Sequence, residues 1–380
     1  MPVIRSPGKR FRNATAVHPC PICNGSSWCS VSDDGAVCCC RRRRGGVERI
    51  DSRGVTYYVH RLAPAARDIT PLTPHVAPAD AGQRADPDTL HRVYTALLDA
   101  LPLDQRHVER LRARGLTGDL RRAGYRTLGR GRARAARALL DAGLGEQLPR
   151  VPGLYLHQHE GGACWTVAGA SGLLIPVRDA QGRVVALQVR ADFAAAGRPR
   201  YSYVSSRSRG GPGPGAPAHV PLFAGDRAVV RVTEGAIKAD VATALSGLLT
   251  VGLPGVGAWG QAAPLLRQLG ARTARVAFDA DARRNPTVSG ALLRLVRDLR
   301  ARGYATEVET WAEGDGKGID DLLAAGCVPE VATGDEALAI AEAIDRAARP
   351  PTAGPPPRRL VRARGRVIAV TVTIPWEVHP

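Results

Sequence analysis

Short apolar runs and amphipathic stretches alternate along the second half of the chain. Apolar runs rich in β-branched residues predict strands at residues 228–232, 248–252, 274–278 and 306–310. The segments after them repeat apolar side chains at helical spacing and predict helices at residues 236–245, 262–269, 288–302 and 320–325. Strands that alternate with helices in this way form a parallel sheet covered by helices. We therefore predict an α/β domain, followed by one more amphipathic helix over 335–348.

The first half of the chain has a different pattern. From about residue 88 to residue 148, apolar side chains recur at helical spacing with Arg-rich positions between them. Two strands are then predicted at 172–178 and 183–190, joined by a turn in which Gly182 lets the backbone reverse. Residues 205–221 are rich in Gly, Pro and Arg and predict a loop. This half is predicted to be a basic, mixed α+β subdomain.

Stretches rich in Pro and Gly divide the chain. The predicted parts are a cysteine-rich unit at 1–60 that includes a strand at 54–59, a linker at 61–88, a basic helical and β-hairpin subdomain at 89–221, the α/β domain at 222–330, a C-terminal helix at 331–349 and a Pro- and Arg-rich tail at 350–380. The tail holds one apparent strand, at 366–374, for which the pattern indicates no partner.

The chain is strongly basic, and its positive charge comes from arginine. Lys and Arg number 53 against 35 Asp and Glu, which gives a formal net charge of +18, and only three of the 53 are lysines. Such an excess attracts polyanions, nucleic acid above all, although a genome that favours Arg codons is the alternative explanation. No apolar run approaches the ~20 residues of a membrane span, and the first residues lack the core of a signal peptide. We expect a cytoplasmic protein without membrane contact.

Six of the eight cysteines fall between positions 20 and 40. A Cys-x-x-Cys turn directs two thiolates at one ion, and later cysteines supply the remaining ligands, so we predict a zinc ribbon that needs the metal to fold. The predicted zinc ligands are Cys20, Cys23, Cys29 and Cys40. The other candidates for the fourth position are His18, Cys38 and Cys39. A redox-active cysteine patch is the alternative. The arginines at 41–44 come directly after the cysteines, where they are expected to meet phosphates.

Carboxylates follow the strands of the predicted α/β domain at the points where the strands end. Glu234 follows the first strand, and Asp279 and Asp281 follow the third. Asp320 and Asp321 come after the last strand and a loop of Gly and Lys. Because the carboxyl ends of parallel strands share one edge, these acids can meet there. Clustered hard oxygen ligands predict a Mg²⁺ or Mn²⁺ site for phosphoryl or nucleotidyl transfer, with helix capping as the alternative.

At these residues the chain resembles the TOPRIM domain of bacterial DnaG-type primases, topoisomerases and related nucleases. The family's strand-end Glu-Gly is matched by Glu234-Gly235, and its Asp-x-Asp by Asp279-Ala280-Asp281. Upstream, residues 174–185 and 200–205 resemble the segments that precede TOPRIM in primases, and Arg114-Gly115-Leu116 resembles the helical start of the primase core. The order of zinc ribbon, basic subdomain and TOPRIM-like domain is also that of a primase, so the resemblance implies a TOPRIM-like parallel sheet with flanking helices.

The resemblance also implies roles for the acids. Glu234 would be the acid/base carboxylate or a metal ligand, and Asp279 and Asp281 would bind Mg²⁺. Asp320 matches the second acid of the family's Asp-Pro-Asp motif, but the first acid falls on Gly318. One carboxylate of the family is therefore missing unless Asp321 substitutes for it.

Four basic residues are expected to contact the substrate: Lys238, Lys317, Arg178 and Arg190. The two lysines fall inside the motif segments, where a phosphate or triphosphate contact is expected and a purely surface position is the alternative. With Lys238, the first motif takes the form Glu-Gly-x-x-Lys-Ala, which is similar to that of primase-like proteins of phages, plasmids and integrative elements. The family's Gly-rich segment is absent at 187–190.

These features together predict a primase-like nucleotidyltransferase. The ribbon and the arginines would hold a single-stranded DNA template, and the acids would hold the divalent metal that aligns a nucleoside triphosphate. The alternatives are a TOPRIM nuclease that uses the same metal site and a non-enzymatic DNA-binding module of a mobile-element replication complex. The chain contains no Gly-x-x-x-x-Gly-Lys-Ser/Thr motif, so we expect a separate protein to supply any replicative helicase.

Overall fold

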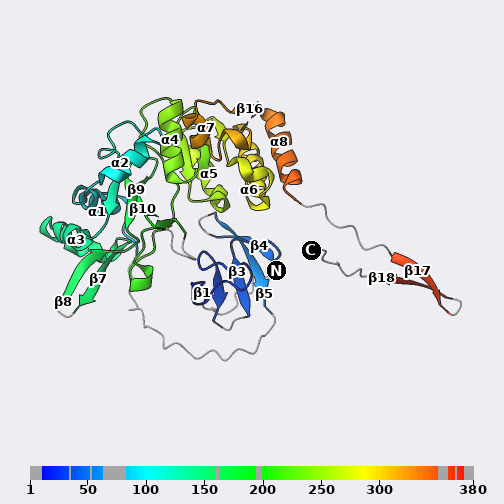
Figure 1. Ribbon diagram of the computed structural model, residues 1–380, viewed down its shortest axis with the longest axis horizontal. Coiled ribbons are helices and arrows are strands. Elements are labelled where there is room, and N and C mark those ends of the chain that lie inside the picture. Colours follow the sequence, from blue (N-terminus) through cyan, green and yellow to red (C-terminus); the bar gives the residue numbers. More distant parts are fainter. Residues whose placement is uncertain are drawn as a thin grey trace.

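The computed structural model describes residues 11–33, 36–51, 54–62, 83–159, 162–193, 199–349 and the strands at 358–363 and 366–371. These residues form two five-stranded sheets, one four-stranded sheet and two separate hairpins (Figure 1). Most of the predicted linker and the Pro-rich start of the predicted tail lie outside the described residues. Among the described helices, none combines the length and the apolar character needed to cross a bilayer.

The N-terminal unit is an antiparallel sheet in the order β1-β2-β3-β5-β4. Its strands are β1 (Phe11–Asn13), β2 (Ser30–Ser32), β3 (Val37–Cys40), β4 (Val47–Ile50) and β5 (Thr56–Arg61). Its buried core consists of one alanine and four cysteines, so little apolar side chain is available to hold the sheet together. The strand predicted at 54–59 is β5, and because it lies between β3 and β4 it belongs to this sheet.

The second unit begins with helices that bury one face. They are α1 (Pro87–Asp99), α2 (Gln105–Arg112) and α3 (Arg132–Asp141), and a 3-10 helix, η1 (Gly145–Arg150), follows. The helical pattern predicted up to residue 148 is wrong at β6 (Arg126–Leu128), which pairs with β9 (Gly172–Arg178). A strand of three residues is too short to show an alternation of its own in the sequence.

The sheet of this unit runs in the order β11-β10-β9-β6, with β10 at Val184–Ala191 and β11 at Tyr201–Tyr203. The predicted hairpin of β9 and β10 is confirmed, and Gly182 has the positive φ of 79° that its turn requires. A second hairpin, of β7 (Leu154–His159) and β8 (Gly162–Val167), was not predicted. Its strands mix polar and aromatic residues without a clean alternation, and so they do not stand out from a loop.

The third unit is the α/β domain, and its strands and helices alternate as predicted. Its strands are β12 (Val229–Glu234), β13 (Thr250–Leu253), β14 (Thr273–Val276) and β15 (Ala305–Thr310). Its helices are α4 (Ala236–Ser246), α5 (Ala262–Leu269), α6 (Pro286–Ala301) and α7 (Ile319–Ala324). The four strands are parallel in the order β13-β12-β14-β15. Helix α4 packs with α7, whereas α5 packs with α6, so helices pack in two groups around the sheet.

The α/β sheet has one more strand than the sequence predicts. Strand β16 (Glu330–Thr333) pairs antiparallel with β15, and α8 (Gly334–Ala347) then packs on α6 and on β15. At the end of the chain, the strand predicted to stand alone has a partner, because β17 (Arg358–Ala363) pairs with β18 (Arg366–Thr371) in a hairpin. The density of Arg in β17 hides its alternation in the sequence.

An ion pair crosses the centre of the α/β sheet. Arg231 in β12 donates two hydrogen bonds, of 2.7 and 2.9 Å, to the carboxylate of Glu309 in β15, and both side chains are buried. Arg275 in β14, the strand between them, lies 3.6 Å from Glu309 as well. Glu309 therefore neutralises Arg231 inside the sheet, and Glu307 is the nearer counter-ion of Arg275. This explains how a strand with an arginine at its centre can be buried.

Removing Glu309 should destabilise the α/β domain strongly, because the buried guanidinium of Arg231 would lose its counter-ion. We predict that Glu309→Ala lowers the free energy of unfolding by about 3–5 kcal/mol in a urea titration. The matched control is Glu307→Ala, which removes a more exposed partner of Arg275 and should cost about 1 kcal/mol. Equal losses for the two variants would contradict this account of the sheet.

Candidate metal centres

The predicted acids lie at the carboxyl edge of the parallel sheet. Glu234 is the last residue of β12, Asp279 and Asp281 follow β14, and Asp320 lies in the first turn of α7, after β15. Gly235, with a φ of 89°, turns the chain from β12 into α4. Because β12, β14 and β15 are parallel, their ends bring these four acids, which we call the acidic cluster, to one side of the domain.

Lys238 joins two acids of the cluster. Lys238 lies in the first turn of α4, four residues after Glu234. Its Nζ is 3.5 Å from Glu234 Oε1 and donates a hydrogen bond to Asp279 Oδ1. Burial alone lowers the pKa of Lys238, but attraction to Glu234 and Asp279 outweighs it and raises that pKa. Burial also raises the pKa of Glu234, in spite of the opposing attraction to Lys238.

Lys317 lies on the outer side of the cluster. Its Nζ is 3.9 Å from Asp279 Oδ2 and 3.9 Å from Asp281 Oδ2, and its side chain is 68% exposed. The Ala280 N–H donates a 2.9 Å hydrogen bond to the carbonyl of Lys317 and so holds this loop beside the Asp-x-Asp segment. The two lysines that the motifs single out are therefore both in the cluster, one largely buried and one in solvent.

Asp320 is the most deeply placed acid, with only 1% of its surface exposed. Its Oδ2 accepts a hydrogen bond from Arg114, which follows α2 in the preceding unit. Burial lowers the pKa of Arg114, but attraction to Asp320 and then to Tyr201 outweighs it and raises that pKa. Nothing in the sequence pattern places Arg114 beside the acids, because its only signal is the Arg-Gly-Leu triplet of the resemblance.

The remaining predicted residues are placed differently. Asp321 accepts a hydrogen bond from the Gly318 N–H at 3.2 Å, which is the cap of α7. The guanidinium of Arg178 donates to the carbonyls of Ala123 and Gly182, so it ties the β9–β10 turn to the loop before β6. The Arg190 guanidinium lies 6.0 Å from the ring centre of Tyr201, the same tyrosine that neighbours Arg114.

The acidic cluster has the ligand chemistry of a divalent-cation site. Its donors are hard carboxylate oxygens, and two of its buried oxygens, Asp281 Oδ1 and Asp320 Oδ1, have no hydrogen-bond partner among the described residues. The carboxylates do not converge on one point, however, because lysine ammonium groups lie between them. Three or more ligand atoms within 4.8 Å of one another occur, in the described part of the chain, only at the cysteines.

The cysteines that lie this close together are the predicted zinc ligands. The Sγ atoms of Cys20, Cys23, Cys29 and Cys40 all lie within 4.8 Å of one another. Cys29 and Cys40 sit side by side at the ends of β2 and β3, with their Sγ atoms 3.9 Å apart. Four thiolates at this spacing suit zinc. Cys38 is outside this group, although its Sγ is 3.5 Å from Cys20 Sγ.

Backbone amides favour the thiolate form of Cys20, which is the form that binds a metal. The N–H groups of Cys23 and Ile22 point to Cys20 and, although burial opposes them, lower its pKa to about 7. Burial raises the pKa of Cys29 and of Cys40. Bringing four such thiols together in the ribbon therefore favours a bound cation, which stabilises their thiolate forms.

The ribbon packs against the α/β domain close to α6 (Figure 1). Arg294 of α6 lies 3.1 Å from Glu48, and the Trp259 indole donates a 3.3 Å hydrogen bond to Thr56. Two of the arginines at 41–44 turn inward, because Arg41 pairs with Asp51 at 2.8 Å and the guanidinium of Arg44 lies over Gly290. The outer surface of the ribbon keeps Arg42 and Arg43 exposed.

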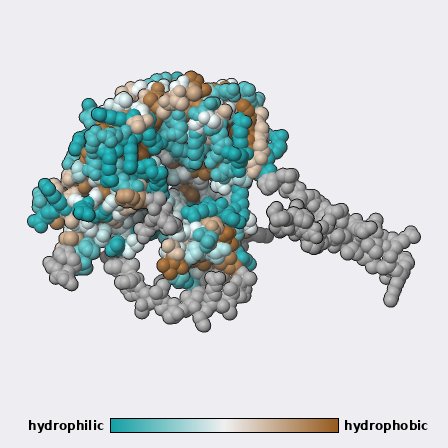
Figure 2. Space-filling model, viewed as in Figure 1, coloured by the Kyte–Doolittle hydropathy of each residue, from teal (hydrophilic) through white to brown (hydrophobic). Residues whose placement is uncertain are grey.

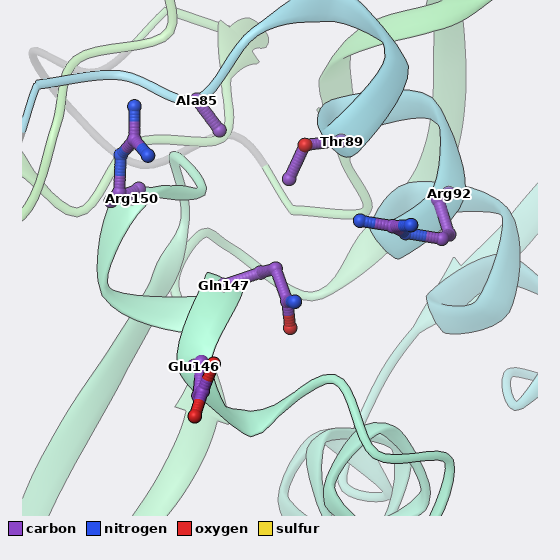
Figure 3. Close-up of a pocket in the computed structure, with 6 residues that line it drawn as sticks. All are labelled: Ala85, Thr89, Arg92, Glu146, Gln147 and Arg150. Atoms are coloured by element: carbon purple, nitrogen blue, oxygen red, sulfur yellow. The ribbon is translucent and has the colours of Figure 1, made fainter.

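A hollow of about 260 Å³ lies away from both clusters, between α1 and η1 (Figure 3). Its lining includes Thr89 and Arg92 from α1 and Glu146, Gln147 and Arg150 from η1. Figure 3 shows these side chains spread around the hollow rather than aimed at one point in it. None of the predicted site residues lines it.

Comparison with known proteins gives a family model and several solved structures. The family model, described as a domain of unknown function (DUF3854), matches residues 223–328. No curated protein matches the chain. The zinc-binding and RNA polymerase domains of Aquifex aeolicus primase match at 14% identity and a TM-score of 0.46, over 63% of this chain and 58% of that chain.

Two other solved structures are similar to the same extent. A DNA primase domain from Pseudomonas aeruginosa matches at 18% identity and a TM-score of 0.44, over 63% of this chain and 75% of that chain. The RNA polymerase domain of Mycobacterium tuberculosis primase DnaG, solved with a double-stranded DNA oligomer that has a 6-nucleotide overhang, matches at 17% and 0.46, over 70% of this chain and 84% of that chain. With identities this low, function has to be inferred from the geometry of the two clusters.

The ribbon should lose its fold when zinc is withheld, because its core holds few apolar side chains besides the cysteines. We predict about one zinc per purified chain by elemental analysis, and a loss of that zinc with rapid proteolysis in the N-terminal 62 residues for Cys20→Ser. The control is Cys164→Ser, a cysteine in β8 outside the cluster. A zinc-free Cys20→Ser chain whose ribbon resists protease as well as the parent would contradict the prediction.

The partly buried charge of Glu234 should make the chain less stable as the pH rises. At low pH Glu234 is protonated in both states, and above the ordinary value of 4.5 the unfolded chain loses this proton first because the folded pKa is raised. Stability is therefore lost as the pH rises through the folded pKa. We predict that Glu234→Gln melts at a higher temperature than the parent at pH 8, and that this gain disappears near pH 4. The exposed Glu336→Gln should show no such pH-dependent gain, and a Glu234→Gln gain that is the same at both pH values would contradict the assignment.

Proposed function

We propose that this protein is a primase-like nucleotidyltransferase with a TOPRIM-type site, which synthesises short primers on single-stranded DNA. The observation that carries the proposal is the acidic cluster, in which four carboxylates from three strand ends lie at one edge of a parallel sheet. Two of their oxygens are buried and have no hydrogen-bond partner in the part of the chain that the structure describes. Such oxygens favour a hard divalent cation, and they are arranged beside cationic side chains that attract phosphate.

Each residue of the cluster has a task in this proposal. Asp279 and Asp281 hold Mg²⁺ or Mn²⁺, with Asp320 behind them, and the ion supplies charge stabilisation for nucleotidyl transfer when bound. Glu234, whose pKa is raised, accepts the proton of a primer 3′-hydroxyl at a carboxylate oxygen. Lys317 binds the phosphates of the incoming nucleoside triphosphate, whereas Arg114 stays paired with Asp320. Arg190, which lies beside Tyr201, extends the positive surface.

The ribbon is the proposed template-binding unit, with zinc held by its four cysteines. It exposes the aromatic side chains of Trp28 and Phe11 and the guanidinium groups of Arg42 and Arg43. Aromatic and cationic groups on one small unit suit base stacking and phosphate contact on single-stranded DNA. Figure 2 shows a group of hydrophobic residues on the lower part of the molecule, where the ribbon lies, and further ones along the top edge of this view. We further propose that the protein acts in the cytoplasm on phage, plasmid or other mobile-element DNA, with a separate helicase.

One observation favours a second candidate, a DNA-binding module without catalysis. The cations at the cluster, Lys238 and Arg114 above all, already neutralise much of its charge. Template binding that persists in an inactive chain would support this candidate, and metal-dependent cutting of labelled DNA would instead support a TOPRIM nuclease.

Asp279→Ala should abolish primer synthesis, because Asp279 contributes an oxygen on each side of the cluster. We predict that ribonucleotide incorporation on a single-stranded template, with Mg²⁺ or with Mn²⁺, falls by more than about 100-fold, which is the effect of losing several kcal/mol of metal-based stabilisation. The control, Asp335→Ala, removes an exposed acid at the start of α8 and should keep parental activity. No template-dependent incorporation by the parent chain under either metal would refute the proposed function.

A further inference from the structure

The two lysines of the acidic cluster hold two different cation positions. Lys238 Nζ lies between Glu234 and Asp279, on the inner side, and its side chain is 21% exposed. Lys317 Nζ lies between Asp279 and Asp281, on the outer side, at 3.9 Å from each and in solvent. Asp279 thus shares one oxygen with each lysine. The inner contact is the shorter and better shielded from water, so it is the harder one to exchange.

Gly318, which has no side chain, borders the inner position. A Cβ built on Gly318 would lie 3.3 Å from Lys238 Nζ and 2.6 Å from Asp320 Oδ1. Lys238 therefore extends into the space that a side chain at position 318 would need. Asp320 Oδ1, for which the described residues offer no hydrogen-bond partner, borders the same space. Position 318 therefore carries no carboxylate, and the ammonium group of Lys238 lies beside it.

The charges of the cluster balance with one divalent ion and not with two. The four carboxylates carry a formal charge of −4, and Lys238 and Arg114 offset two of them through the contacts described above. One divalent ion in place of the Lys317 ammonium brings the sum to zero. A second ion would leave an excess of two positive charges in a partly buried site, which is strongly unfavourable.

We propose that the acidic cluster binds a single divalent cation, between Asp279 and Asp281, and that Lys238 is built into the site as the substitute for a second one. This inference rests on the proposed function, since it assumes that the cluster binds metal. On binding, the exposed Lys317 leaves its position between the two aspartates and becomes available to phosphate, whereas Lys238 stays. Lys238 is in this sense a positioning residue that sets how many ions the site takes.

The test is the number of Mn²⁺ ions bound to the zinc-loaded full chain, measured by calorimetry and by the electron paramagnetic resonance signal of free Mn²⁺. The parent should bind one ion outside the cysteine cluster. Lys238→Ala should bind two, because the inner position gains both space and negative charge. Lys317→Ala is the matched control: it removes the same charge from the same aspartate but should still bind one ion, about two- to five-fold more tightly, as expected for the loss of one exposed ion pair.

Each outcome decides the matter. Two ions in the parent, or one ion in a folded Lys238→Ala chain, would overturn this inference and leave the proposed function intact. No Mn²⁺ binding by the parent would overturn the metal site of the proposed function and this inference with it. Thermal melting verifies that Lys238→Ala is folded. If it is not folded, the number of ions bound by the parent still tests the inference. Asp281→Asn adds a second test, because it should weaken binding of the single ion at least ten-fold.

Discussion

Four carboxylates held at one edge of a sheet repel one another, and this structure depends on the lysine and arginine side chains that neutralise them. Lys238 comes from the helix that follows the first acid, Lys317 from the loop before α7 and Arg114 from another unit of the chain. Each cation therefore ties a different segment to the cluster. The acids, in return, define where α4, α7 and the loop after α2 meet, and so the site also organises the fold around it.

Arg114 gives the cluster its connection to the rest of the molecule. Next to its contact with Asp320, a second polar network crosses the same boundary, because Tyr125 donates a hydrogen bond to Asp240 and His219 lies 3.1 Å from that carboxylate. The backbone N–H of Arg178 donates a hydrogen bond to the other ring nitrogen of His219, Nδ1. Since Asp240 lies two residues after Lys238 in α4, the β9–β10 sheet and the acidic cluster are fixed to one another through this helix.

The sequence was most informative where one physical rule fixes the outcome. Buried parallel strands alternate with helices, so β12 to α7 could be predicted, and their shared edge placed Glu234, Asp279 and Asp320 together. Cysteine spacing indicated the metal site but left its fourth ligand open, and the structure groups Cys40 with Cys20, Cys23 and Cys29. Short or Arg-rich strands such as β6 and β17 carry too little pattern to be predicted. The contact of Arg114 with Asp320 joins residues 206 positions apart and depends on packing between units, which no local pattern encodes.

Anomalous diffraction from crystals of the full chain soaked in Mn²⁺ would show directly how many divalent cations the acids hold. For the proposed site of one cation beside Lys238, we expect a single manganese peak at the acidic cluster, in contact with Asp279 and Asp281, with the Lys238 ammonium still between Glu234 and Asp279. Two peaks in the cluster, or a peak at the position of the Lys238 ammonium, would contradict it.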